Sequence, residues 1–234
     1  MKAKDAKMEL AKFSDTKKIK VYSRFFKTGR GEYGEGDQFI GVTVPNCRRI
    51  SKKYSNMDFV QIEKLLYSPV HEERLTALLI LVDQFEKGDK YKKNEVFEYY
   101  IKHKNQVNNW DLVDLSAYKI VGAYLDERPR KILYKLAGSN NLWDKRISII
   151  STFWFILHDD FCDTLAISEM LIEDKHDLIH KAVGWMLREV GKKDLNEEEI
   201  FLKKHYKIMP RTCLRYAIEK FPEFKRRAYL DGTV

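Results

Sequence analysis

Apolar residues recur in this chain at intervals of three and four positions, and no stretch alternates convincingly between apolar and polar residues. In the segment 72–87 the apolar positions with this spacing are Leu75, Leu78, Leu79, Val82 and Phe85. Such spacing places the apolar side chains on one face of an α-helix. Residues 110–125 repeat the pattern directly after Asn109, a residue type that favours the N-cap position. The pattern predicts an all-α protein.

Glycine, proline and cap-forming residues mark the ends of these predicted helices. Gly88 and Gly191 stand just after two periodic segments, in the place of a helix C-cap. Pro129 suits the first position of a short helix, and Pro210 opens the last clear helix, which ends before Pro222. The further predicted helices are residues 48–54, 58–66, 93–103, 129–138, 142–157, 161–172, 177–190, 197–206 and 210–222.

The predicted helices recur at a nearly constant interval. Arg74, Trp110, Arg146 and Trp185 occupy similar places near the starts of four helices and are separated by 36, 36 and 39 residues. Two helices with their turns need a period of this size, which is typical of HEAT-like repeats. We therefore predict a HEAT-like α-solenoid of antiparallel helix pairs, a curved slab with a basic concave face.

Nothing in the chain has the composition of a linker, which favours one domain over residues 1–234. In this interpretation residues 1–45 form an N-terminal helix and a glycine-rich loop, and residues 222–234 form a C-terminal tail. The 43 Lys and Arg residues against 35 Asp and Glu give a net charge of +8, which favours a polyanionic partner.

Several observations indicate an intracellular protein. The three cysteines, Cys47, Cys162 and Cys213, include no CxxC pair and are expected to be reduced, buried thiols. Residues 1–13 lack the apolar core of a secretory signal, and the longest apolar runs are too short to cross a membrane. We expect a cytoplasmic, nucleoid-associated protein without a membrane partner.

Residues 29–34 match the pattern GxGxxG on paper. The segment follows the aromatic helix end Phe25-Phe26 and not a strand, and no βαβ unit surrounds it. A dinucleotide site needs that context. We therefore interpret the segment as a glycine-rich loop that lets the chain turn.

Residues 176–180, HDLIH, place His176 and His180 one helical turn apart, as in the zinc motif HExxH. Aspartate replaces the glutamate of that motif, and no third ligand stands at a helpful spacing. Two surface histidines on one helix face are the better interpretation, so no metal site is predicted.

The segment 108–114, NNWDLVD, contains the most informative pair of side chains. Trp110 and Asp114 are four residues apart, so on a helix they project from one face. An indole face and a carboxylate both attract a cationic group. For an isolated pair the competing interpretation is a core tryptophan and a solvated or paired carboxylate.

Two further helices extend this pattern. Lys145 and Arg146 begin the next repeat, and the segment 181–188, KAVGWMLR, contains Trp185 between Lys181 and Arg188. Its glycine, Gly184, costs about 1 kcal/mol relative to alanine inside a helix, which indicates close approach of a neighbour or a ligand. If corresponding helices line one concave face, Trp110, Asp114, Arg146 and Trp185 converge there.

Together these segments resemble the DNA alkylation repair family of AlkD-like DNA glycosylases. The resemblance rests on NNWDLVD at 108–114, WDKR at 143–146, KAVGWMLRE at 181–189 and the stretch from His71 to Leu81. It extends from about Phe39 to Tyr216 and so covers most of the chain. The glycine-rich segment 29–36 does not match family residues, which leaves contacts of the N-terminal helices with the opposite DNA strand undefined.

The resemblance implies excision of purines alkylated at N3 or N7 from double-stranded DNA, with no metal or cofactor. It also implies that Trp110, Trp185 and Asp114 surround the deoxyribose of the lesion, while Arg146 binds a nearby phosphate. Lys145, Lys181 and Arg188 are further candidate DNA contacts, and a slab that embraces a duplex can act as a monomer.

Two other functions are compatible with the sequence. A non-catalytic HEAT-repeat protein would recognise damaged or distorted DNA through phosphate contacts alone. A scaffold would bind an acidic protein and would not need Asp114. Paired lysines and arginines elsewhere in the chain are interpreted as solvated surface charges.

Overall fold

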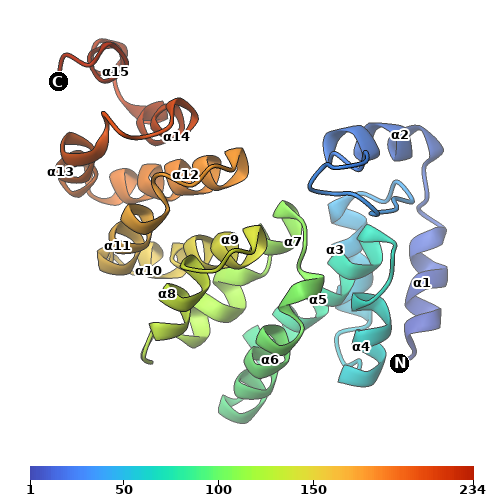
Figure 1. Ribbon diagram of the computed structural model, residues 1–234. Coiled ribbons are helices and arrows are strands. Elements are labelled where there is room, and N and C mark those ends of the chain that lie inside the picture. Colours follow the sequence, from blue (N-terminus) through green and yellow to red (C-terminus); the bar gives the residue numbers. More distant parts are fainter. The chain divides into compact units, whose positions relative to one another are not determined.

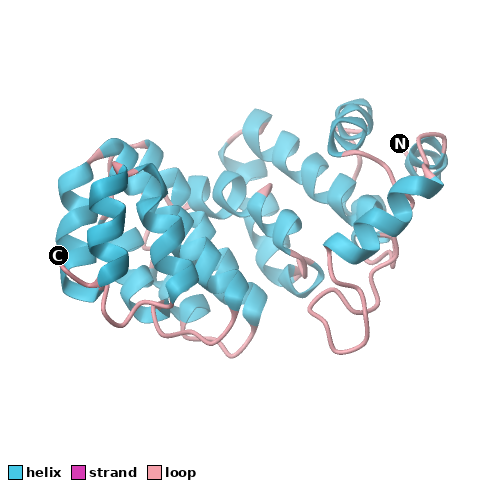
Figure 2. Cartoon of the chain, turned by 90° about the horizontal axis from the view of Figure 1, so that it is seen from above, coloured by secondary structure: helices cyan, strands magenta, loops and turns pink.

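The computed structural model describes residues 1–234, and all of its regular elements are helices. No strand forms (Figure 2). The one β-type contact is an isolated parallel bridge between Gln38 and Val70. None of the helices is both long enough and apolar enough to span a lipid bilayer. The elements are α1 (Ala3–Ala11), α2 (Thr16–Phe25), α3 (Val44–Lys53), α4 (Phe59–Leu66), α5 (His71–Lys87), α6 (Lys90–Lys102), η1 (Lys104–Gln106), α7 (Trp110–Asp114), η2 (Tyr118–Gly122), α8 (Lys131–Ala137), α9 (Leu142–Ser151), α10 (Phe153–Leu157), α11 (Cys162–Leu171), α12 (Asp177–Lys193), α13 (Leu195–His205), α14 (Arg211–Ala217), η3 (Ile218–Lys220) and α15 (Glu223–Asp231).

The chain divides into two compact units, residues 1–120 and residues 121–234. In the first unit α5 is the central helix and packs against α3, α4 and α6 (Figure 1). Every residue from His71 to Val82 is buried. The polar side chains of such a helix need partners within the protein, and His71, Glu72 and Arg74 find them in the contacts described below.

In the second unit α12 is the central helix and packs against α9, α11, α13 and α14 (Figure 1). Gly184 lies where α12 meets α14. A Cβ at this position would stand 2.4 Å from the carbonyl oxygen of Cys213 and 2.6 Å from the Cβ of Tyr216. The close approach predicted at Gly184 is confirmed, and the neighbour is α14.

The all-α prediction is confirmed, and most of the predicted helices agree with the structure within a few residues. The predicted N-cap Asn109 accepts a hydrogen bond from the backbone N–H of Trp110, and Asn141 accepts from Trp143 and Asp144 at the start of α9. These caps are local interactions between close neighbours in sequence, which is why the sequence predicts them well.

The continuous helix predicted over residues 110–125 is wrong. α7 ends at Asp114, and after a turn the chain forms the π-helix η2. Ser116 lies in that turn, fully buried, and its hydroxyl donates to the carbonyl oxygen of Leu112 at 2.5 Å. A serine that bonds back to the preceding turn bends and weakens a helix, which accounts for the break.

The single helix predicted over residues 142–157 is also interrupted, at Thr152. The Ser151 hydroxyl donates to Ile147 O at 2.6 Å, and the Thr152 hydroxyl donates to Ile149 O at 2.7 Å. Both hydroxyls are buried, so they take partners from their own helix and separate α9 from α10.

One of the two glycine caps and the C-terminal tail differ from prediction. Gly191 lies inside α12, which continues to Lys193 because Asp194 caps the next helix. Gly88 is the C-cap of α5, as predicted, although its backbone angles are extended (φ −74°, ψ 152°) and not left-handed. The predicted tail contains α15, which ends at Asp231 and is capped by Gly232 with φ 75°.

The three cysteines are free, as predicted, but they differ in burial. Cys47 and Cys213 are buried, whereas Cys162 is exposed at the first position of α11, where no apolar element covers it. The prediction of a buried thiol is therefore wrong for Cys162.

Candidate functional site

Trp110 and Asp114 lie one turn apart on α7, as the sequence predicts, and both side chains are half-buried. The Trp110 ring stacks on Phe26 with 5.2 Å between ring centroids and a 15° interplanar angle. It also contacts the edge of Phe25 at 5.7 Å. Because two aromatic rings from the end of α2 hold the indole, its orientation is fixed by packing.

A buried polar network lies behind this pair, and sequence reasoning missed it. The two ring nitrogens of His71 contact Asp37 at 3.0 Å and Asp111 at 2.9 Å. The Arg74 guanidinium donates to Asp37 at 2.6 Å, and the Asn109 amide donates to the same carboxylate at 3.0 Å. The network joins the loop before Phe39, the start of α5 and the first turn of α7.

The opposite charges in this network shift one another's pKa values toward the ionised forms. Burial alone would lower the pKa of His71, but the charge of Asp111 and hydrogen bonds to Asp111 and Asp37 outweigh it and raise the pKa to about 9. Burial would raise the pKa of Asp37, yet His71 and Arg74 hold it below its usual value. These contacts favour the imidazolium form of His71 at neutral pH.

Glu72, the neighbour of His71, fixes the same loop in a second way. Its buried carboxylate accepts hydrogen bonds from the backbone N–H groups of Ile40, Gly41 and Val42 at 2.8–3.2 Å. Gly41 has φ 80°, a conformation that glycine adopts without strain. The available signal in the sequence was a set of charged residues at the start of an otherwise apolar helix.

Arg146 and Trp185 belong to the second unit. Arg146 is 4% exposed, and its Nη1 donates to the carbonyl oxygen of Leu178 at 2.6 Å. Trp185 is half-buried on α12, its Nε1 donates to Glu189 at 3.0 Å, and its ring contacts Phe153. Both side chains therefore have orientations set by neighbours in their own unit.

The three remaining candidate DNA contacts are all in ion pairs. Lys145 pairs with Asp174 at 2.6 Å, and Lys181 pairs with Asp177 at 2.7 Å. Arg188 pairs with two carboxylates, those of Glu189 and Glu219. A phosphate that binds any of these cations must compete with a carboxylate.

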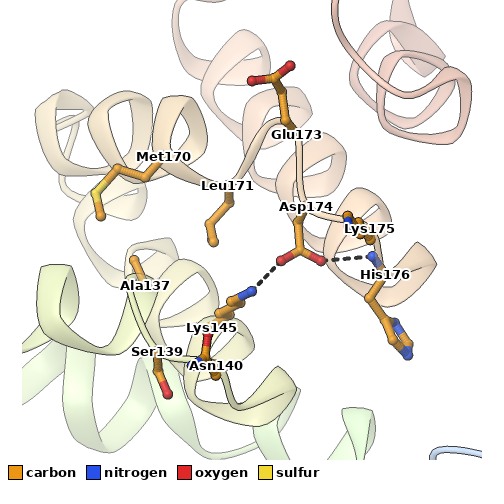
Figure 3. A pocket seen from close by; sticks show the side chains of 11 residues that line it. Ala137, Ser139, Asn140, Lys145, Met170, Leu171, Glu173, Asp174, Lys175 and His176 are labelled. Carbon is orange, nitrogen blue, oxygen red and sulfur yellow. Dashed lines mark hydrogen bonds and ion pairs between the residues drawn. The ribbon is translucent and has the colours of Figure 1, made fainter.

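The Lys145–Asp174 pair crosses a pocket of about 560 Å³ between the end of α11 and the start of α9 (Figure 3). Asp174 also accepts a hydrogen bond from the backbone N–H of His176 at 2.8 Å. Burial would raise the pKa of Asp174, but Lys145 and this N–H hold it below its usual value.

The structure thus forms two groups of predicted site residues, one in each unit. Trp110 and Asp114 are together in the first unit. Arg146, Trp185 and the three paired cations are in the second unit. Convergence of both groups on one face stays a prediction.

The segments that resemble GxGxxG and HExxH, residues 29–34 and 176–180, have structural roles. Residues 29–34 form a turn-rich loop, in which Gly34 lies so close to Phe26 that a Cβ would stand 2.3 Å from its carbonyl oxygen. His176 caps α12 by accepting from the backbone N–H of Leu178, and a ring nitrogen of His180 contacts the carbonyl oxygen of Asp174. No group of three side chains that could hold a metal ion forms.

Comparison with known proteins gives a consistent result. A family model described as DNA alkylation repair enzyme matches residues 6–221. A solved structure described as a predicted DNA alkylation repair enzyme from Enterococcus faecalis superposes with a TM-score of 0.71 at 15% identity, over 90% of this chain and 97% of that chain. No curated protein matches the sequence. These matches agree with the resemblance found in the sequence and with the helical fold.

Proposed function

The chain belongs to the DNA alkylation repair enzyme family, and from this premise we propose that it is a monofunctional DNA glycosylase that removes purines alkylated at N3 or N7 from duplex DNA. The observation that supports this most is the pair formed by Trp110 and Asp114, one turn apart on α7. An aromatic face beside a carboxylate is suited to a centre that becomes positively charged.

Hydrolysis of this N-glycosidic bond needs little acid catalysis at the leaving purine. An N3- or N7-alkylated purine is cationic, so when the N-glycosidic bond breaks, the bonding electron pair leaves with the purine and neutralises it. Positive charge develops on the deoxyribose, and a water oxygen forms the new bond to its anomeric carbon and loses a proton to solvent. Asp114 stabilises the sugar cation and orients that water.

Trp110 supports the same charge through its ring face. Its stacking on Phe26 and edge contact with Phe25 favour this role, because a held ring needs no reorganisation during the reaction. Trp185 is assigned the same role from the second unit, where its indole N–H is already bonded to Glu189.

We assign to Arg146 the role of binding a DNA phosphate, and its guanidinium is oriented by the Leu178 carbonyl. Lys145, Lys181 and Arg188 are assigned further phosphates, which they would bind by exchanging their present carboxylate partners. In this proposal the protein acts as a monomer in the cytoplasm, on double-stranded DNA, without a metal or cofactor.

The test is release of free alkylated purine from methylated duplex DNA. Asp114→Asn removes the charge and keeps the size of the side chain, and we expect it to lower the single-turnover rate by about 10²-fold or more. Asp5→Asn, an exposed aspartate in the first turn of α1, is the matched control and should keep the wild-type rate.

Full activity of Asp114→Asn would refute the role of this carboxylate. A wild-type protein that binds the methylated duplex but releases no purine would refute the glycosylase assignment and identify a non-catalytic DNA-binding protein. Binding to an acidic protein with no response to DNA lesions would favour a scaffold.

A further inference from the structure

His71 stands between two carboxylates. Its Nδ1 lies 3.0 Å from Asp37 and its Nε2 lies 2.9 Å from Asp111, and its side chain is 2% exposed. A neutral imidazole has one N–H donor and one acceptor, so it can satisfy only one ionised carboxylate. When both carboxylates are ionised, only the imidazolium donates to both, so the geometry favours the protonated ring.

The charged groups that act on His71 come from three elements, and two further groups, Glu72 and Cys47, lie beside them. Asp37 comes from the loop, Asp111 from α7, and Arg74 from one turn along α5. Glu72 is balanced by the backbone N–H groups of the loop, and Cys47 on α3 stays neutral because burial raises its pKa to about 12. Two positive and two negative charges remain, and loss of the His71 proton would leave one buried carboxylate without compensation.

His71 also supports Trp110 along two routes. Asp111 directly follows Trp110, so its bond to His71 holds the backbone of the first turn of α7. Phe26 contacts the His71 ring at 5.0 Å and stacks on Trp110 at 5.2 Å. Phe39 stacks on the imidazole at 4.6 Å and completes this packing.

We propose that His71 is a positioning residue, whose imidazolium holds the first turn of α7 so that Trp110 and Asp114 keep the geometry needed for base excision. The proposal rests on the glycosylase function proposed above. His71 does not touch the reacting atoms, and it acts through Asp111 and Phe26. Loss of its proton loosens α7 and lowers the excision rate.

The expected effect is a loss of rate in alkaline solution. A displacement of about 1 Å at a reacting group lowers a rate by about a hundredfold, so we expect the excision rate to fall by ten- to a hundredfold as His71 is deprotonated. The midpoint should lie near 9, the pKa to which the two carboxylates raise this imidazole. His71→Gln has no titrating group, and its rate should be lower at neutral pH and flat from pH 8 to 10.

The experiment has two independent readouts on the full chain. The first is NMR of protein labelled with ¹⁵N at histidine and tryptophan, from pH 6 to 10, with signals assigned from His71→Gln and Trp110→Phe. The second is the rate of purine release over the same range, corrected for release in a protein-free sample. His158→Gln, an exposed histidine in the second unit, is the matched control and should leave both curves unchanged.

We expect both nitrogens of His71 to be protonated at pH 7 and the Trp110 indole signal to follow the His71 titration. Asp111→Asn removes one carboxylate and should lower the His71 midpoint by at least one pH unit, so the test does not depend on His71→Gln folding. A neutral His71 at pH 7, a Trp110 signal that does not follow His71, or parallel losses of rate in wild type and His71→Gln would overturn the proposal. If wild type releases no purine at any pH, the glycosylase assignment fails, and the NMR titration still decides whether His71 holds α7.

Discussion

Replacing Glu72 tests whether its carboxylate fixes the loop that leads into α3. Oε1 accepts from three backbone N–H groups, those of Ile40, Gly41 and Val42, and Oε2 accepts from Ile40 as well. Glu72→Ala removes every acceptor. Glu72→Gln keeps one carbonyl oxygen, which can replace Oε1 and contact the same three groups.

The structure sets the expected magnitudes. An unsatisfied buried donor costs about 1–3 kcal/mol, and the N–H groups of Gly41 and Val42 are buried while that of Ile40 is partly buried, so Glu72→Ala should lower the free energy of unfolding by about 3–6 kcal/mol. Hydrogen bonds to a charged acceptor are roughly twice as strong as neutral ones, so Glu72→Gln should lose about 1–2 kcal/mol.

The assay must report on the first unit, because two compact units need not unfold together. Trp110 is the only tryptophan in residues 1–120, so its indole NMR signal in a urea titration isolates that unit. Glu95→Gln is the control, since Glu95 is an exposed partner of Lys92 and should change stability by less than about 0.5 kcal/mol.

Two results would contradict this reasoning. If the free energy of unfolding of Glu72→Ala lies within about 1 kcal/mol of the wild-type value, the N–H groups find other partners and the carboxylate is not essential. If Glu72→Gln is as unstable as Glu72→Ala, the charge matters and the single oxygen does not.

Three further predictions follow from contacts described above. Gly184→Ala would place a Cβ 2.4 Å from a carbonyl oxygen of α14, and thermal unfolding should show the second unit destabilised by about 2–4 kcal/mol. In the control Gly138→Ala the new Cβ would have no atom closer than 3.6 Å, so stability should not change. Because the folded-state pKa of His71 is raised from 6.5 to about 9, its protonation contributes about 3 kcal/mol to the free energy of unfolding of the first unit. This contribution is complete below pH 6.5 and is lost as the pH rises through 9. Urea titrations followed by the Trp110 signal at pH 6.5 and pH 10 would measure the loss. Asp174→Asn removes the ion-pair partner of Lys145 and should tighten binding to duplex DNA at low salt; unchanged affinity would mean that Lys145 does not contact a phosphate.

The sequence predicts those features that depend on neighbours within about one helical turn. Trp110 and Asp114 share a helix face because their spacing requires it, and Asn109 and Asn141 cap helices that begin beside them. The breaks after Asp114 and at Thr152 were not predicted. They depend on whether a hydroxyl is buried, which tertiary packing determines.

The His71 network could not be predicted from spacing for the same reason. Asp37 and His71 are 34 residues apart, and His71 and Asp111 are 40 apart. An aspartate in a loop and a histidine at a helix start are ordinary surface residues by composition. Only the fold shows that they are buried together, because α5 is covered on all sides by apolar residues from other helices.

The π-helix at Tyr118–Gly122 has a consequence for how related chains differ in length. A π-turn closes its hydrogen bonds over one residue more than an α-turn does, so it can be regarded as an α-helix with one inserted residue. Deleting a single residue from this segment would restore α-helical geometry without breaking the helix. Among related chains a one-residue gap is therefore expected here, inside the partly buried helical segment 117–124, although insertions and deletions are usually confined to surface loops.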